Sequence, residues 1–287
     1  MKTAVNRHAL PLYFFLAYAI SWLIWLPLVL SGQGWVEGDF SPYLHALGFM
    51  GPMLAAVVVT GVARGLSGIQ KLLSGLIRFR INWRWYAFVL LVPPLLFIGA
   101  AAINYLALGK WPNWQGYGRI DDLFPGMGLL GTAVLHFLIV GVGEEVGWRG
   151  FALPRLQIQR SALRATLILS IFWGFWHLPT FLFENSLWSG LGMALFFVLI
   201  TFPVAVIYTW LYNGSGGSLL ITSLWSTLTT LVLASATASG IIPIVFTIFL
   251  IIIAMILANK QRVGSGTARN RYWSVMLFGR KSGAARR

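Results

Sequence analysis

The sequence predicts an all-α membrane protein, a polytopic bundle of about eight transmembrane helices. Hydrophobic residues make up 58% of the 287 residues and charged residues only 10%, whereas a soluble domain usually carries about 25% charged residues. A membrane-spanning helix needs roughly 20 mostly apolar residues. Candidate spans lie near 11–31, 43–63, 86–108, 129–152, 165–184, 190–211, 217–238 and 240–258. Only a short turn around Gly240 separates the last two, so seven spans is the main alternative.

The distribution of charged residues supports these spans. If the chain crosses the membrane eight times, 19 of its 21 basic residues fall on one side, with Lys110 and Arg119 on the other. Five of the seven acidic residues share that other side: Glu37, Asp39, Asp121, Asp122 and Glu184. Cytoplasmic loops carry an excess of Lys and Arg. We therefore expect a multi-pass protein of the cell inner (plasma) membrane with both termini in the cytoplasm.

The chain divides into four regions. Residues 1–125 hold three spans and a basic segment, 65–85, expected at the membrane interface. Residues 126–238 hold the next four spans, residues 239–258 the last span, and residues 259–287 a basic cytoplasmic tail. We expect the basic loops and tail to contact anionic lipid, and not nucleic acid. The sequence contains no cysteine, which excludes disulfides, thiolate metal ligands and thiol catalysis.

Two acidic residues, Glu144 and Glu145, lie inside the fourth predicted span. A carboxylate at membrane depth costs at least ~2.5 kcal/mol, so each needs a partner, water or a proton. Glu145 and Arg149 are four residues apart on one helix face, which predicts a structural ion pair. Glu144 has no cation at helical spacing, so its partner must come from another helix. We interpret it as functional, against the alternative of an architectural glutamate bonded to backbone or water.

The fifth span supplies a candidate partner for Glu144, because consecutive helices usually pack together. His177 lies in this span, just before Pro179. A Glu and a His that share one water make a general-base pair, and they are also two potential ligands of a larger metal site. His45 and His136 also fall in predicted spans. We expect each to be a satisfied polar group, since neither has a carboxylate three or four residues away.

The seventh span carries several hydroxyl residues. Ser226 and Thr230 are four residues apart and share one helix face. One interpretation is that they complete the site begun by Glu144 and His177. The other is that their hydroxyls bond the backbone of their own helix, as Ser and Thr routinely do in lipid.

These residues resemble the motifs of the CPBP family, the CAAX protease and bacteriocin-processing membrane proteins. The segment Glu144-Glu145-Val-Gly-Trp-Arg149 matches the family's EExxxR motif. Trp173-Gly-Phe-Trp-His177 resembles its FxxxH motif, with Trp173 in place of Phe. Gly217-Ser218-Leu219-Leu220 aligns with the start of the third motif. The resemblance covers roughly residues 126–235, and the first three spans carry none of it.

The resemblance implies an intramembrane endopeptidase acting on a peptide or protein substrate in the membrane. Glu144 would be the general base that activates water, with His177 as its partner. The third motif would stabilise the oxyanion, and here Ser226 and Thr230 stand where the family usually has His and Asn. This difference removes a candidate metal ligand. No cofactor is therefore expected, and a divalent metal is not favoured. A cavity open to the cytoplasm should hold the site.

Two other functions remain open from the sequence. A catalytically weak or inactive relative would act as a membrane scaffold or as a bacteriocin-immunity-type protein, and the altered third motif favours it. A proton-coupled carrier would use Glu144 directly, but the sequence has no internal repeat of the kind seen in many carriers. The protease interpretation requires that Glu144, His177, Ser226 and Thr230 converge in one cavity.

Overall fold

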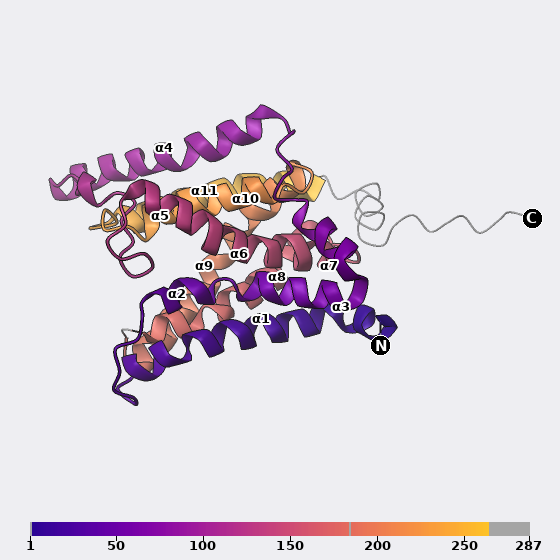
Figure 1. The fold of residues 1–287 in the computed structure, drawn as a ribbon. Coiled ribbons are helices and arrows are strands. Elements are labelled where there is room, and N and C mark those ends of the chain that lie inside the picture. Colours follow the sequence, from indigo (N-terminus) through magenta and orange to yellow (C-terminus); the bar gives the residue numbers. More distant parts are fainter. Residues whose placement is uncertain (1, 184, 264–287) are drawn as a thin grey trace, which may run out of the picture.

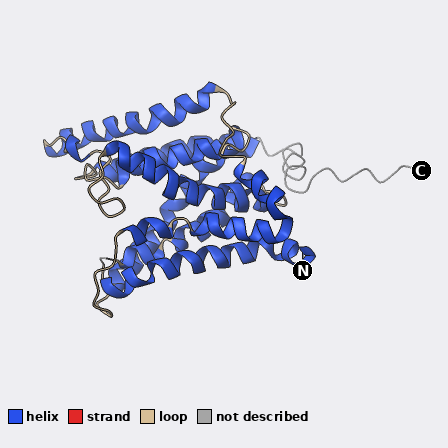
Figure 2. Ribbon diagram, in the orientation of Figure 1, coloured by secondary structure: helices blue, strands red, loops and turns tan. Residues whose placement is uncertain are grey.

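The computed structural model describes residues 2–183 and 185–263, and every regular element within these ranges is a helix (Figures 1 and 2). Seven helical segments there are long and apolar enough to cross a membrane. They are His8–Gly32, Tyr43–Leu73, Trp83–Leu108, Leu129–Leu156, Ala162–Leu182, Leu187–Gly214 and Ile242–Asn259. The prediction of an all-α polytopic membrane bundle is confirmed. Most of the predicted tail, from residue 264 on, and Glu184 lie outside the described residues.

The long segments contain the labelled helices of Figure 1. The first three segments hold α1 (Lys2–Gly32), α2 (Tyr43–Gly48) with α3 (Gly51–Leu73), and α4 (Trp83–Leu108). The fourth holds α5 (Leu129–Leu135), α6 (Val142–Glu145) and α7 (Leu153–Leu156). The remainder are α8 (Ala162–Trp176), extended by a 3₁₀ turn (Leu178–Leu182), α9 (Leu187–Gly214) and α11 (Ile242–Val263).

The seventh predicted span is a shorter helix, α10 (Leu219–Leu233), of 15 residues. At its beginning, the amide of Leu219 donates to the carbonyl of Gly75, in the loop between α3 and α4, over 2.9 Å. Beyond its end, the amide of Ala236 donates to the carbonyl of Arg119, after α4 has finished, over 3.0 Å. Helix α10 therefore runs from one end of the bundle to the other and adds a short crossing to the seven long ones.

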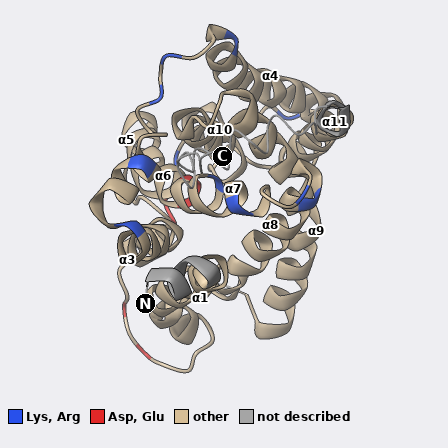
Figure 3. Cartoon of the chain, turned by 90° about the vertical axis from the view of Figure 1, so that its right-hand side faces the viewer, with Lys and Arg blue, Asp and Glu red and all other residues tan. Residues whose placement is uncertain are grey.

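The loops divide the bundle into two ends of different charge. We define the basic end by the loops 74–82, 157–161 and 215–218, and the acidic end by the loops 33–42, 109–128 and 234–241. Hydrogen bonds join loops of the same end: Ser218 Oγ donates to the Arg78 carbonyl over 2.9 Å, and Thr237 Oγ1 to the Asn113 carbonyl over 3.2 Å. Figure 3 looks onto the basic end, where the Lys and Arg positions face the viewer.

The fourth long segment is not a uniform α-helix. Two π-helical stretches, His136–Gly141 and Val146–Ala152, flank the four-residue helix α6, which carries both glutamates. Such π stretches re-aim side chains and occur frequently at functional sites. The neighbouring helix packs closely here: a Cβ on Gly147 would lie 2.6 Å from the backbone of Pro52, and one on Gly143 2.7 Å from the carbonyl oxygen of Phe49. Both positions therefore require glycine, and α6 is held directly against the start of α3.

Aromatic side chains fill the core behind α6. The rings of Trp25 and Trp176 have centroids 4.9 Å apart, and Trp148 contacts Trp176 edge-on at 5.6 Å. All three indoles are fully buried. Tyr13 of α1 stacks on Phe151 at 4.8 Å. Edge-on and offset ring contacts of this kind add about 0.5–1.5 kcal/mol each beyond simple burial, so this cluster fixes α1, α8 and the glutamate segment relative to one another.

Candidate active site

The structure brings the four predicted site residues to one cavity. Glu144, His177, Ser226 and Thr230 all line a cavity of about 350 Å³ between the central helices. Glu144 comes from α6, His177 from the end of α8, and the two hydroxyl residues from α10. Residues far apart in the sequence therefore face the same enclosed space.

Glu144 is held by a tryptophan from the neighbouring helix. The side chain of Glu144 is buried, and its Oε2 accepts a 2.5 Å hydrogen bond from Nε1 of Trp173 on α8. Among the described residues no direct hydrogen bond joins Glu144 to His177. The partner expected from another helix is thus Trp173, the residue that stands where the family motif has Phe. A phenylalanine has no N–H group and could not make this bond.

His177 is oriented by the same tryptophan. Its Nδ1 lies 2.8 Å from the main-chain carbonyl oxygen of Trp173. A carbonyl oxygen only accepts, so Nδ1 carries the hydrogen, and Nε2 of the neutral ring is left as an acceptor. The helix ends here: α8 stops at Trp176, and Pro179 lies in the following 3₁₀ turn. Trp173 therefore holds Glu144 through its indole and His177 through its carbonyl.

Glu145 and Arg149 form a buried ion pair beside the cavity. Arg149 Nη1 lies 2.7 Å from Glu145 Oε1, and the two side chains are 0% and 1% exposed. The guanidinium also lies between two rings, 4.3 Å from the centroid of Trp173 and 4.1 Å from that of Tyr208. Nε and Nη2 of Arg149 have no hydrogen-bond partner in the described part of the chain. Cation–π contacts, worth about 2 kcal/mol when desolvated, take the place of those hydrogen bonds.

The hydroxyl groups of α10 differ in their hydrogen bonds, and Ser223 Oγ donates to the carbonyl of Gly141 over 3.1 Å. Thr222, Thr227 and Thr229 donate to carbonyls of their own helix, over 3.2, 3.0 and 2.8 Å. Within the described residues no such bond to the helix is made by the hydroxyl of Ser226 or of Thr230. The two predicted positions are thus the ones whose hydroxyls remain available to the cavity.

Comparison with known proteins gives two similarities to membrane proteases. The model for type II CAAX prenyl endopeptidase Rce1-like proteins matches residues 126–232. A CAAX prenyl protease 2 from Methanococcus maripaludis is 24% identical over 214 residues, which cover 70% of this chain and 74% of that protein. These two similarities support a membrane protease of the CPBP family. The matched range runs from just before α5 to the end of α10 and contains both glutamates, His177 and the α10 hydroxyls.

The cavity also contains a histidine, His136, that was not predicted to belong to the site. His136 is fully buried and lines the cavity, with Nδ1 3.2 Å from Thr227 Oγ1. The Thr227 hydroxyl donates to its own helix, so it accepts from Nδ1–H, and Nε2 of His136 is left without a partner among the described residues. The expectation that His136 is a satisfied polar group holds for only one of its ring nitrogens.

The π-helical stretch explains why His136 was missed. In a regular α-helix, residues eight apart point about 80° away from each other, which would turn His136 away from Glu144. The intervening stretch, His136–Gly141, has more residues per turn. It therefore brings His136 round toward the face that carries Glu144. A regular helical period cannot reveal this.

The cavity extends toward the acidic end of the bundle. Its lining runs from Glu144 and Ser226 at mid-depth to His45, Ala234 and the exposed Asp122. The sequence led us to expect a cytoplasmic basic end and also a cavity open to the cytoplasm, and both stay predictions. Trp173 and Tyr208 line the cavity, and the guanidinium group of Arg149 lies against both rings.

The cavity contains residues of the types that bind metal ions in proteins. Glu144, His177 and His136 line the same cavity. In residues 2–183 and 185–263, however, no three His, Asp or Glu side chains lie close enough together to share a metal ion.

Proposed function

We propose that this protein hydrolyses peptide bonds with a water molecule activated by Glu144 and His177. The observation that supports this most is that one residue, Trp173, positions both side chains. Its indole N–H donates to the carboxylate of Glu144, and its carbonyl accepts from the ring of His177. A fixed carboxylate and a fixed imidazole acceptor beside one cavity are what a general-base pair requires. The loss of cleavage in Glu144→Gln is the direct test.

In the proposed steps, Glu144 carries one proton from water to the leaving nitrogen. The free Oε1 of an ionised Glu144 takes one proton from the water while Nε2 of His177 accepts a hydrogen bond from the other. The water oxygen attacks the carbonyl carbon of the peptide and forms a tetrahedral intermediate with an oxyanion. When the carbon–nitrogen bond breaks, the protonated Glu144 returns its proton to the leaving nitrogen, and the carboxylate is restored. No cofactor takes part in these steps.

We further propose that hydroxyl groups stabilise the oxyanion. Ser226 and Thr230 line the cavity and are not engaged by the α10 backbone, and Tyr208 lines the same wall. His136 and His177 are poor candidates, because each uses Nδ1–H elsewhere and presents Nε2 as an acceptor in the neutral ring. Hydroxyls donate a hydrogen bond without adding charge, which distinguishes this chain from the family's usual third motif.

Replacing Ser226 by Ala is expected to lower kcat by about 10²–10³-fold with a small effect on KM, because an oxyanion donor acts in the transition state. Thr229→Val is the matched control. Thr229 lines the same cavity, but its hydroxyl already donates a hydrogen bond to the carbonyl of Trp225. The measurement is steady-state cleavage by both variants. Equal kcat values for the two would contradict the assignment of Ser226.

The name of the Methanococcus relative, CAAX prenyl protease 2, refers to prenylated substrates. We propose a peptide or protein substrate that enters from the membrane, and a peptide of the C-a-a-X type is the first to test. The same peptide should be compared with and without its prenyl group, since nothing in the cavity residues requires an isoprenoid.

We propose that the protein resides in the plasma membrane with its basic end and both termini in the cytoplasm, following the excess of Lys and Arg there. The cavity then opens on the opposite side of the membrane.

Single cysteines test this orientation, because the chain has none of its own. Asp122→Cys marks the acidic end and Ser74→Cys the basic end. In intact cells a membrane-impermeant maleimide is expected to label only Asp122→Cys, and Ser74→Cys should react only after permeabilisation. The reverse pattern would place the cavity on the cytoplasmic side and contradict the orientation inferred from charge.

A further inference from the structure

The carboxylate of Asp122 lies at the mouth of the candidate active-site cavity. Of the described residues that line this cavity, Asp122 and Ala234 are the two exposed ones, so they mark where it opens. Within the same lining, Asp122 and Glu144 are acidic and no described residue is Lys or Arg. An approaching peptide therefore meets one negative charge at the mouth and, when Glu144 is ionised, a second one at mid-depth.

A short turn holds Asp122 in place. The amides of Leu123 and Phe124 both donate to the carbonyl of Ile120, over 3.1 and 2.8 Å. The side chains of these three residues are buried, which anchors the turn in the core on both sides of Asp122. The carboxylate is therefore presented at a defined place on the rim of the cavity.

The adjacent acidic residue, Asp121, differs from Asp122 in its contacts. Its Oδ2 lies 3.2 Å from Nη2 of Arg119, and its Oδ1 accepts from the amide of Gly126 over 3.4 Å. Asp121 does not line the cavity. Within the described part of the chain Asp122 forms no such ion pair. Its charge thus remains available to a group that arrives at the cavity.

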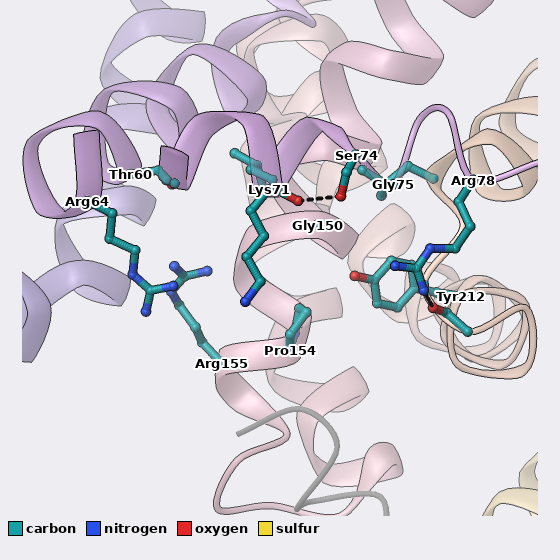
Figure 4. Close-up of a pocket in the computed structure, with 15 residues that line it drawn as sticks. Thr60, Arg64, Lys71, Ser74, Gly75, Arg78, Gly150, Pro154, Arg155 and Tyr212 are labelled. Atoms are coloured by element: carbon teal, nitrogen blue, oxygen red, sulfur yellow. Dashed lines mark hydrogen bonds between the residues drawn. The ribbon is translucent and has the colours of Figure 1, made fainter. Parts of the chain in front are cut away.

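The cationic side chains of the central helices lie outside the cavity lining. Arg149 is paired with Glu145 and is not among the lining residues. At the basic end, a separate pocket of about 70 Å³ brings together four cations, Arg64, Lys71, Arg78 and Arg155 (Figure 4). The described cavity is therefore complementary in charge to a cationic group of a substrate.

Helix α10 gives the distance from the mouth to the proposed reaction centre. Ser226, the proposed oxyanion donor, and Ala234, which caps the end of α10, are eight positions apart and both line the cavity. Eight helical residues span about 12 Å. The loop that carries Asp122 meets this end of α10, since the amide of Ala236 donates to the carbonyl of Arg119 over 3.0 Å. An extended peptide covers about 3.3–3.6 Å per residue, so about three or four residues bridge this distance.

Aromatic side chains place the mouth at the level of the membrane–water interface. Trp35, Trp111 and Trp114 belong to the loops of the acidic end and are 66%, 54% and 52% exposed. Exposed Trp side chains at the ends of a membrane bundle are typical of this interface. Lys and Arg side chains can cover apolar surface with their stems and keep the charged group in water. A basic side chain of a substrate can therefore stay hydrated beside Asp122 while the rest of the peptide lies deeper.

We propose that Asp122 selects substrates that carry a Lys or Arg side chain about three or four residues from the scissile bond. This inference rests on the proposed function, because it concerns the substrate of the same site. The ammonium or guanidinium group pairs with the Asp122 carboxylate at the mouth while the peptide bond reaches Glu144 and Ser226. An acidic side chain at the same position is repelled, so the discrimination combines attraction with repulsion.

The test compares peptides that are identical except for one residue. Lys, Gln or Glu is placed at each position from roughly two to six residues away from the scissile bond, on either side, to bracket the expected distance. The purified full-length protein is assayed at low ionic strength. At the selected position, kcat/KM for the Lys peptide is expected to exceed that for the Glu peptide by about 5-fold, mainly through KM, as for two unit charges about 4 Å apart in water. Added salt should reduce this ratio.

Substitutions at Asp122 should change the preference in a defined direction. Asp122→Asn is expected to remove the difference between the Lys and Glu peptides, and Asp122→Lys to invert it. The matched control is Asp121→Asn, which makes the same chemical change one residue away, at a side chain that is outside the cavity and paired with Arg119. This control should keep the wild-type preference. Asp122 is exposed, so its variants should fold, and thermal unfolding checks this.

Peptide binding separates this inference from the proposed function. The same peptides, carrying a fluorescent label, are titrated onto Glu144→Gln, where Asp122 is the acidic residue left in the described lining. A lower Kd for the Lys peptide that is lost in Glu144→Gln/Asp122→Asn would support the role of Asp122 even if no peptide were cleaved. Equal binding of the Lys and Glu peptides would overturn it. An Asp121→Asn variant that loses the preference as fully as Asp122→Asn would also overturn it, because general attraction to the acidic end would then suffice.

Discussion

Replacing Glu144 by Gln is expected to lower the rate of peptide cleavage by about 10²–10⁴-fold, the contribution of a positioned general base. Glutamine keeps the size of the side chain and can still accept the hydrogen bond from Trp173 through its amide oxygen. The protein should therefore remain folded while the water molecule loses its base. His177→Ala is expected to act in the same direction, because it removes the second acceptor beside the water.

The measurement is cleavage of a fluorogenic peptide by purified protein, with thermal unfolding as the test of folding. Glu37→Gln is the matched control, since it makes the same chemical change at an exposed residue outside the cavity. Wild-type cleavage by a folded Glu144→Gln variant would refute the mechanism. If a cellular phenotype also persisted in that variant, the scaffold or immunity-type function would be favoured.

Replacing Arg149 by Ala is expected to destabilise the protein by about 3–5 kcal/mol, the usual cost of leaving one member of a buried ion pair unpaired. Glu145 would keep a carboxylate at 1% exposure with no cation beside it. The rings of Trp173 and Tyr208 would lose the group that lies between them. The expected result is a large drop in Tm in detergent and a low yield of folded protein.

A second substitution separates the charge effect from a general packing defect. In the double variant Glu145→Leu/Arg149→Met both charges are removed and the volume is largely kept, so much of the lost stability should return. A double variant as unstable as Arg149→Ala would show that packing, and not the unpaired carboxylate, dominates. An Arg149→Ala variant as stable as wild type would contradict the importance of the pair.

The sequence was sufficient for the features that depend on local spacing. Long apolar segments predicted the membrane bundle, and the separation of Glu145 and Arg149 by four residues predicted a contact that a 2.7 Å distance now describes. The motif residues Glu144, His177, Ser226 and Thr230 were also identified before their helices could be placed. These inferences need only the helical period and the cost of burying charge.

The remaining features depend on three-dimensional packing. The hydrogen bond from Trp173 to Glu144 joins residues 29 positions apart, and no periodic pattern encodes it. The π-helical stretch that turns His136 into the cavity breaks the regular period. The extent of the cavity, from Trp173 and Tyr208 to Asp122 and Ala234, depends on how side chains of several helices pack. At the basic end, Arg64 and Lys71 line one pocket together with Arg78 and Arg155, and this arrangement depends on a kink at Gly65.

Trp173 contacts three charged or titratable side chains at once. Its indole nitrogen holds Glu144, its carbonyl holds His177, and its ring covers Arg149. A small displacement of this one residue, for instance when a substrate enters, would be transmitted to all three partners together. The functional groups of the site are therefore energetically coupled through a single side chain. Substitutions among them will not have independent effects, and the cost of changing any one will depend on whether Trp173 is still in place.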